Sequence, residues 1–211
     1  MALKIKYFHR GQFDPSQLRE DNIDRLSTSL VPHGSKVLEL GCATGFMGNY
    51  LTKKLHCRVI GVDINPAVKA DITGDLAKTS VWQEIKPHRP FDVVFASAIL
   101  EHLPDPETTL QLIKSVLKPK GILIITLPNV AHWRQRLKLL RGHWDYEDYG
   151  LLDQTHLRFF NYFSGQRLIT AAGFTINQIL IDPAGGLKYF NWLVKHFPNL
   201  YAYQICIKAN K

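Results

Sequence analysis

The sequence predicts an α/β fold in which one mostly parallel sheet is covered by helices on both faces. Short apolar runs, such as residues 37–40 and 91–97, alternate along the chain with stretches of helical periodicity. Several of these runs are followed at once by glycine or acidic residues, as is typical of strands that end at a ligand-binding edge. The 211 residues, 45% of them apolar, are enough for a full hydrophobic core, so we expect residues 1–211 to form one domain.

Composition limits the location and the partners of the chain. No apolar run approaches the ~20 residues of a membrane-spanning helix, and the N-terminus lacks an apolar stretch of signal-peptide length. Cys42, Cys57 and Cys206 indicate neither a disulfide framework nor a zinc site, so we expect a cytoplasmic protein. The net charge of +8 is spread along the chain, which favours a solvated basic face over a nucleic-acid-binding tail.

The N-terminal part, residues 1–30, is predicted to be a cap segment before the first strand. Asp14, followed by a proline and by Gln17, predicts the start of an amphipathic helix that continues through residues 18–30. The segment contributes to packing, and its residues 7–10 are also candidates for contact with a ligand.

The stretch 36–48 is the part around which the chain is organised. Residues 37–40 predict a strand, which breaks at Gly41 into a turn of small residues and is followed from Phe46 by a helix. Glycines let a ligand approach the backbone, and the start of the helix directs N–H groups into the turn. A nucleotide-like ligand is therefore the first hypothesis, although the dinucleotide fingerprint fails at Ala43 and Phe46.

The next strand, residues 58–64, places Asp63 about 20 positions beyond the glycine turn. At the end of a neighbouring parallel strand, this carboxylate can accept hydrogen bonds from a ribose diol. Asn65 and Pro66 predict the start of another helix. A short extended stretch at 70–73 then leads to Gly74 and Asp75, and a turn or helix cap is an alternative role for Asp75.

Residues 91–97 predict a buried strand, which leads into a loop with Glu101 and His102. These two side chains are candidates for acid or base chemistry, and a salt bridge or capping pair is the simpler alternative. An amphipathic helix at 107–117, a turn at 118–121 and a strand at 122–127 follow, and the ligand crevice is expected at the carboxyl ends of the strands.

From residue 128 to 163 the alternation of strands and helices stops. This insert is rich in aromatic, histidine, aspartate and arginine residues, and we expect it to overhang the crevice as a lid. The chain resumes with a capped helix at 164–172 and a strand at 174–181. A loop at 185–186, a short helix at 187–197 and a last, antiparallel strand at 198–208 complete it.

The motifs together resemble those of the class I S-adenosylmethionine-dependent methyltransferases. The matches are an acidic residue two before a glycine turn at 41–45, the acidic residues 63 and 75, and a Phe-Asp-Val-Val strand before Glu-His-Leu-Pro-Asp-Pro at 101–106. Ala43 stands where the family pattern has glycine. The resemblance implies a Rossmann-like sheet of seven strands, the last antiparallel, and S-adenosylmethionine as cofactor. The residues that the resemblance implies as contacts of this cofactor are Glu39, Gly41, Cys42, Ala43, Gly45, Asp63, Ile64, Asp75, Leu76 and Ser97.

The insert resembles that of MetW-like and ubiquinone-type O-methyltransferases, in which an aromatic, histidine-bearing lid approaches the acceptor. His156 is the candidate general base, because imidazole can take the proton of an acceptor hydroxyl near neutral pH. A structural histidine is the alternative, with Arg158 pairing Asp153. The histidines and carboxylates at 143–156 show no diagnostic ligand spacing, so no metal is predicted.

The resulting hypothesis is methyl transfer to an oxygen or nitrogen of a small-molecule acceptor. Two alternatives stay open. One is a cofactor-binding accessory protein that modulates a partner enzyme through exposed apolar residues in 187–197. The other, an RNA methyltransferase, rests on the charge alone, and binding to nucleic acid is not expected. A homodimer or a partner enzyme is left open.

Overall fold

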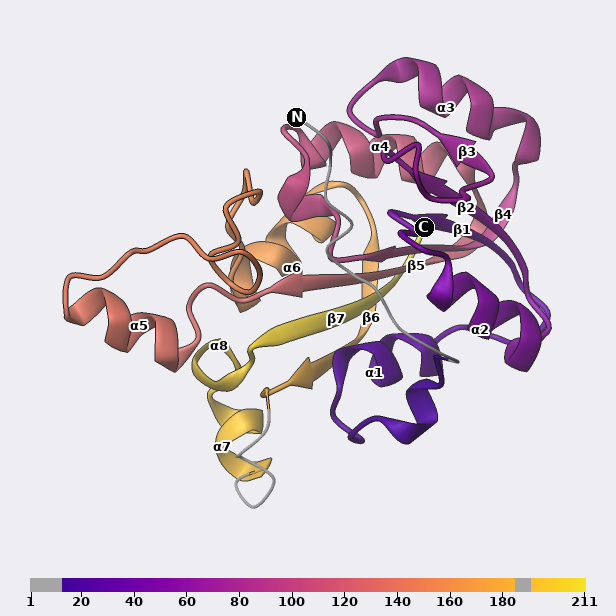
Figure 1. The fold of residues 1–211 in the computed structure, drawn as a ribbon. Helices are drawn as coiled ribbons and strands as arrows, with labels where there is room; N and C mark the ends of the chain where they lie inside the picture. The colour runs from indigo at the N-terminus through magenta and orange to yellow at the C-terminus, as the bar shows by residue number, and fades with distance from the viewer. Residues whose placement is uncertain (1–12, 185–190) are drawn as a thin grey trace.

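The computed structural model describes residues 13–184 and 191–211 (Figure 1). The ligand-contact candidates at residues 7–10 and the expected loop at 185–186 lie outside the described residues.

A seven-stranded sheet in the order β3-β2-β1-β4-β5-β7-β6 forms the centre of the molecule (Figure 1). The first five strands in this order are parallel, and β7 runs antiparallel to both β5 and β6. This confirms the predicted sheet and its antiparallel last strand. The strands are β1 Lys36–Leu40, β2 Arg58–Asp63, β3 Ile72–Thr73, β4 Phe91–Ser97, β5 Leu117–Pro128, β6 Thr175–Asp182 and β7 Gln204–Asn210.

Helices cover both faces of the sheet, as predicted. On one face α3 (Thr79–Ile85), α4 (Pro106–Val116) and α6 (Tyr162–Ala171) pack against side chains such as Leu38 and Val94. On the other face α1 (Ile23–Ser29) and α2 (Phe46–Leu55) pack against alternate strand residues such as Val37 and Phe95. Because successive side chains of a strand point to opposite faces, strands buried on both sides are apolar nearly throughout.

The local structure differs from the prediction at two places before β3. The helix expected from Asp14 is divided into a 3-10 helix, η1 (Pro15–Gln17), and α1, which begins after its own cap Asn22. Asp14 does cap η1, by accepting from Ser16 N. The helix expected at Asn65 is absent, because the Asn65 side chain accepts from Ala67 N and forms a turn instead.

Three further boundaries were predicted wrongly. Strand β5 begins at Leu117, the expected last residue of the preceding helix, and includes residues 118–121, which were expected to form a turn. Helix α6 begins at Tyr162, earlier than the predicted start at Ser164, because the side chains of Asn161 and Ser164 form a reciprocal capping box. Pro198–Tyr201 forms the short helix α8, directly after α7 (Asn191–His196), and the last strand starts later, at Gln204.

The strand register brings the predicted ligand-binding positions to one edge. Leu40 pairs with Val62 of β2 and with Ala96 of β4, so the turns after these three strands lie side by side. The chain passes from β1 to β2 on one side and later returns to β4 on the other side. In open α/β sheets such a switch point is where ligands bind.

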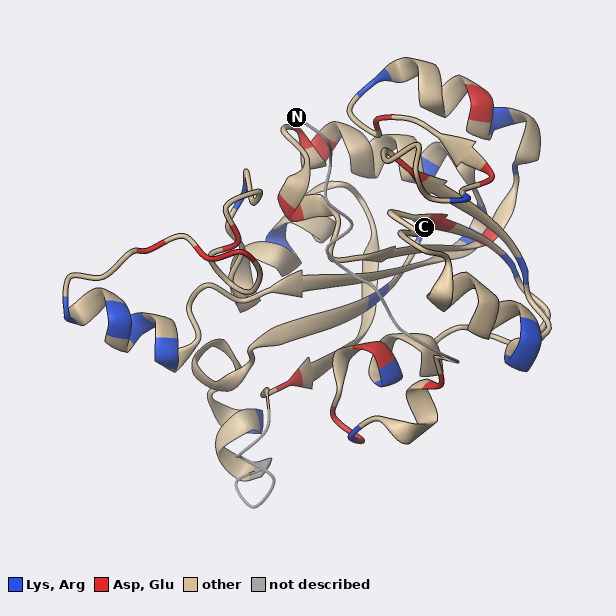
Figure 2. Cartoon of the chain, in the orientation of Figure 1, with Lys and Arg blue, Asp and Glu red and all other residues tan. Residues whose placement is uncertain are grey.

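The insert after β5 extends away from the sheet and holds the helix α5 (Trp133–Leu140) (Figure 1). Figure 2 shows a group of basic residues on α5, formed by Arg134, Arg136 and Lys138. The second half of the insert returns to the body of the protein. Its backbone forms one isolated parallel β-bridge, between Glu147 and Asp153. Within residues 13–184 and 191–211, no helix has the length and apolar character needed to span a membrane.

Candidate functional site

The turn after β1 is built for close approach to the backbone. Gly41 and Gly45 have φ of +72° and +74°, and Ala43 has φ of +47°, so three residues lie in the left-handed region. The φ of +72° at Gly41 is one that residues with a Cβ rarely adopt, so glycine suits this position, and a Cβ there would also lie 2.8 Å from Ile99 Cδ1. Gly45 is also the N-cap of α2 and offers no side chain to its first N–H groups. The backbone N–H groups at the start of α2 are therefore able to donate to an electron-rich group of a ligand.

Asp63 ends β2 beside this turn and supports it. Its Oδ2 accepts from Ala43 N and its Oδ1 accepts from Asn65 N, both at 2.8 Å. Each carboxylate oxygen can accept a second hydrogen bond, so these contacts orient Asp63 without using up its capacity as an acceptor. Ile64 follows with 49% of its surface exposed, which places an apolar side chain next to the carboxylate.

Glu39 lies below the turn and is buried. The pKa of its carboxyl is raised to about 8, chiefly because the group is buried; the charges of Asp63 and Asp71 contribute to the rise, and a hydrogen bond from the Gly48 backbone acts in the opposite direction. A Cβ at Gly48 would lie 2.6 Å from Glu39 Oε2. Glu39 thus packs against the first turns of α2 and helps to fix the position of the helix.

The raised pKa of Glu39 predicts a change of stability with pH. The folded protein holds this proton up to about pH 8, while the unfolded chain releases it near 4.5. The contribution of Glu39 is therefore fully present below pH 4.5 and is lost as the pH rises toward 8. Between pH 6 and pH 8 we expect the wild type to lose on the order of 2 kcal/mol of stability relative to Glu39→Gln. Denaturant unfolding at the two pH values measures this difference.

The matched control is Glu84→Gln, on the exposed surface of α3, which should follow the wild type at both pH values. A Glu39→Gln variant with the same pH dependence as the wild type would show that burial does not hold the Glu39 proton.

Two of the expected cofactor contacts have side chains that point into the protein. Cys42 is buried against Gly61, where a Cβ would lie 2.9 Å from its Sγ, and burial raises the pKa of the thiol to about 12. Leu76 belongs to the core, and its carbonyl accepts from Trp82 Nε1 at 2.9 Å. A ligand at this edge would therefore meet the backbone of Cys42 and Leu76, whose contacts with a cofactor stay predictions.

Asp75 lies just after β3, and Ser97 is the last residue of β4. Asp75 Oδ1 accepts from Ala77 N at 2.9 Å, so the capping role exists and occupies one of the carboxylate oxygens. Ser97 Oγ shares a 3.0 Å hydrogen bond with Thr126 Oγ1, which also accepts from Ala98 N. The sequence prediction missed Thr126, although the expected pairing of the two strands could have placed it opposite Ser97.

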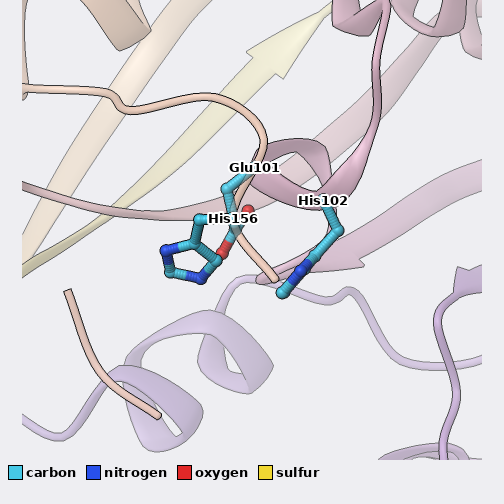
Figure 3. Close-up of side chains that lie close together, drawn as sticks. All are labelled: Glu101, His102 and His156. Atoms are coloured by element: carbon cyan, nitrogen blue, oxygen red, sulfur yellow. The ribbon is translucent and has the colours of Figure 1, made fainter. Parts of the chain in front are cut away.

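A second group of polar side chains lies just beyond β4. Glu101 and His102, from the 3-10 helix η3 (Leu100–His102), meet His156 of the insert (Figure 3). The two imidazole rings stand edge to face with 4.8 Å between their centres. The pKa of Glu101 is raised to about 8, chiefly by burial and to a lesser extent by the charge of Asp153. The structure thus joins a loop and an insert that the sequence treats as separate candidates.

Backbone hydrogen bonds hold this part of the insert against η3. The Glu101 carbonyl accepts from Leu157 N at 2.8 Å and from Arg158 N at 3.0 Å. The Arg158 guanidinium donates to the Pro104 carbonyl, which differs from the pairing with Asp153 considered from the sequence. The Asp153 carboxylate instead accepts from Thr155 N and Thr155 Oγ1 and shapes the turn that carries His156.

The fold is that of the class I S-adenosylmethionine-dependent methyltransferases. The switch point of the sheet carries a glycine turn after β1 and carboxylates after β2 and β3, and the last strand is antiparallel. The chain belongs to the methyltransferase family, because the family model described as "Methyltransferase domain" matches residues 8–179.

Curated relatives resemble part of the chain. Ubiquinone biosynthesis O-methyltransferase of Actinobacillus pleuropneumoniae is 29% identical over 137 residues, which are 56% of this chain and 57% of that protein. A 2-methyl-6-phytyl-1,4-hydroquinone methyltransferase of Synechocystis is 31% identical over 114 residues, 50% of this chain and 34% of that protein. The chain spans about half or less of the length of these two relatives.

Solved structures resemble it over most of its length. A SAM-dependent methyltransferase from Archaeoglobus fulgidus has a TM-score of 0.59 at 19% identity and covers 89% of this chain and 90% of its own. The 1,6-didemethyltoxoflavin-N1-methyltransferase of Burkholderia thailandensis, crystallised with 1,6-didemethyltoxoflavin and S-adenosylhomocysteine, has a TM-score of 0.58 at 17% identity and covers 91% of this chain and 79% of its own. At these identities the likeness concerns the fold.

Proposed function

We propose that this protein transfers the methyl group of S-adenosylmethionine to an oxygen or nitrogen of a small-molecule acceptor. The observation that carries the proposal is the single edge at which the glycine turn, Asp63, Asp75 and Ser97 meet. Membership of the methyltransferase family supports it, as do the relatives, which are named as methyltransferases of small molecules.

The residues of this edge fit the cofactor part by part. The positive φ angles at Gly41 and Gly45 and the uncapped start of α2 suit the carboxylate of the methionine portion. The carboxylate of Asp63 suits the ribose hydroxyls, and the exposed Ile64 suits one face of the adenine ring. Asp75 retains one carboxylate oxygen beyond its cap to accept from the adenine amine.

When bound, the cofactor supplies an electrophilic methyl group on a positively charged sulfur. The protein has to hold the acceptor atom in line with that methyl group and exclude water. As the new bond forms, the methyl–sulfur bond breaks and the cofactor leaves as a neutral thioether. A hydroxyl acceptor also loses a proton, for which we propose His156, held near the edge by Asp153 and by the Leu151 carbonyl, as the base.

The test is to incubate the purified protein with S-adenosylmethionine labelled in the methyl group and a panel of phenolic, catecholic, sugar and amine acceptors. We expect label in at least one acceptor and an equal amount of S-adenosylhomocysteine. Binding of the cofactor without transfer to any acceptor of the panel would favour the accessory role and contradict the proposed activity.

The accessory alternative is supported by one observation. Trp192, in the first turn of α7, and Phe197, directly after this helix, are exposed, and their ring centres lie 6.2 Å apart, so they offer an apolar surface to a partner protein. If this surface serves a regulatory partner, Trp192→Ala should abolish co-purification of that partner and leave cofactor binding unchanged. The RNA alternative still rests on the net charge alone.

A further inference from the structure

We propose that Glu101, His102 and His156 form a binding site for a divalent transition-metal ion such as zinc. One ligand atom of each residue lies within 4.8 Å of the ligand atoms of the other two (Figure 3). Two imidazole nitrogens and one carboxylate oxygen are a donor set that suits zinc and similar ions better than calcium or magnesium. No spacing in the sequence indicates this site, because His156 comes from a segment far from the other two residues.

The carboxylate of Glu101 is the first argument for a bound cation. The residue is 1% exposed, and its Oε2 has no hydrogen-bond partner among the described residues. A buried carboxylate oxygen without a partner is unfavourable, since nothing replaces the water that it loses on folding. A metal ion bound between this oxygen and the two imidazoles would satisfy it.

The surroundings of the two imidazoles are the second argument. His102 Nδ1 lies 3.2 Å from the Thr155 carbonyl, and His156 Nδ1 lies 3.3 Å from the Leu151 carbonyl. A carbonyl only accepts, so in each neutral ring Nδ1 carries the proton and the lone pair is at Nε2. Metal-binding histidines are held in this way, with one nitrogen donating to a carbonyl and the other on the metal.

Binding requires only a small rearrangement. Ligand atoms around a tetrahedral zinc ion lie roughly 3.3 Å apart, given metal–ligand distances of ~2.0–2.1 Å. The present separations of up to 4.8 Å close to that value by rotation of the side chains. The backbone around the cluster is held already, because the Glu101 carbonyl accepts from Leu157 N and Arg158 N, which follow His156.

The site's place in the fold gives the ion a role. Three protein ligands leave a fourth position open, and η3 follows β4 at the same edge as the proposed cofactor site. An acceptor oxygen in that position would lose its proton to water more readily and then take the methyl group from the sulfonium. His156 would thus act as a ligand in place of a base, and this part of the inference rests on the proposed methyl transfer.

The test uses the full chain, stripped with a chelator and titrated with zinc chloride alone, by calorimetry and by metal analysis after gel filtration. We expect one zinc ion per chain. Cobalt(II) should replace it and show the intense visible absorption of a tetrahedral site. Glu101→Gln and His102→Gln should each lower the zinc affinity by more than about 100-fold, beyond the 10- to 100-fold typical of outer-shell changes.

His143→Gln is the matched control, because His143 is an exposed histidine that faces Asp145 at 3.5 Å outside the cluster. It should bind zinc as the wild type does. The proposal is overturned if the wild type retains less than a tenth of an equivalent of zinc. It is also overturned if Glu101→Gln binds zinc with the same affinity as the wild type. Cofactor binding by the stripped protein, measured in parallel, separates this result from a failure of the proposed function.

Discussion

Replacing Asp63 by alanine is expected to lower the affinity for S-adenosylmethionine by at least about 100-fold. A hydrogen bond to a charged group contributes about 1.5–3 kcal/mol, and the variant loses two such bonds to the ribose. It also loses the acceptors for Ala43 N and Asn65 N, so the glycine turn is held less firmly in the form that the ligand needs. Isothermal titration with S-adenosylhomocysteine measures the change.

Asp92→Ala is the matched control for this substitution. Asp92 also accepts from a backbone N–H of the neighbouring strand, Lys36 N at 2.8 Å, but it lies at the opposite edge of the sheet. Both variants should lose some stability, and Asp92→Ala should bind the cofactor like the wild type. Equal affinities in the folded Asp63→Ala and Asp92→Ala proteins would place the cofactor elsewhere.

Replacing His156 by alanine is expected to lower the rate of methyl transfer to a hydroxyl acceptor by about 10²- to 10⁴-fold. The imidazole lies in the cluster beyond β4, where it contacts the Leu151 carbonyl and the His102 ring. Whether His156 is the general base or a ligand of the proposed metal ion, it acts on the acceptor and not on the cofactor, so the affinity for S-adenosylmethionine should stay within about twofold of the wild type. Single-turnover kinetics with the acceptor found in the panel measure the effect.

His88→Ala, an exposed histidine at the other end of β4, controls for general effects of losing an imidazole. The rate with this variant should match the wild type. If His156→Ala transfers methyl groups at the wild-type rate, then His156 is not the base, and no metal ion bound through it takes part in the transfer.

Much of the fold could be predicted because the strands are buried on both faces. Phe91–Ser97 is apolar nearly throughout, and its bounds were predicted correctly. The antiparallel β7 followed from the resemblance and not from periodicity. Residues 14–30 were less predictable, because α1 is capped by Asn22. An asparagine side chain can hydrogen-bond to the backbone either in a turn or at the start of a helix, so its presence alone does not mark a helix start.

The site could be predicted at the level of the edge and not of the contacts. Asp63 was placed from its spacing and Asp75 from the family resemblance, but the backbone groups that they accept from depend on the turn conformations. That Cys42 and Leu76 turn their side chains inward follows from packing against Gly61 and Trp82, which lie in other elements. The meeting of His102 with His156 depends on how the insert returns to η3.

The most direct test of the central claim is the calorimetric titration of the folded wild-type protein with S-adenosylmethionine. We expect one binding site per chain with a dissociation constant in the micromolar range and competition by S-adenosylhomocysteine. An absence of binding heat, together with no shift of the melting temperature by either compound, would contradict the assignment of this edge to the cofactor.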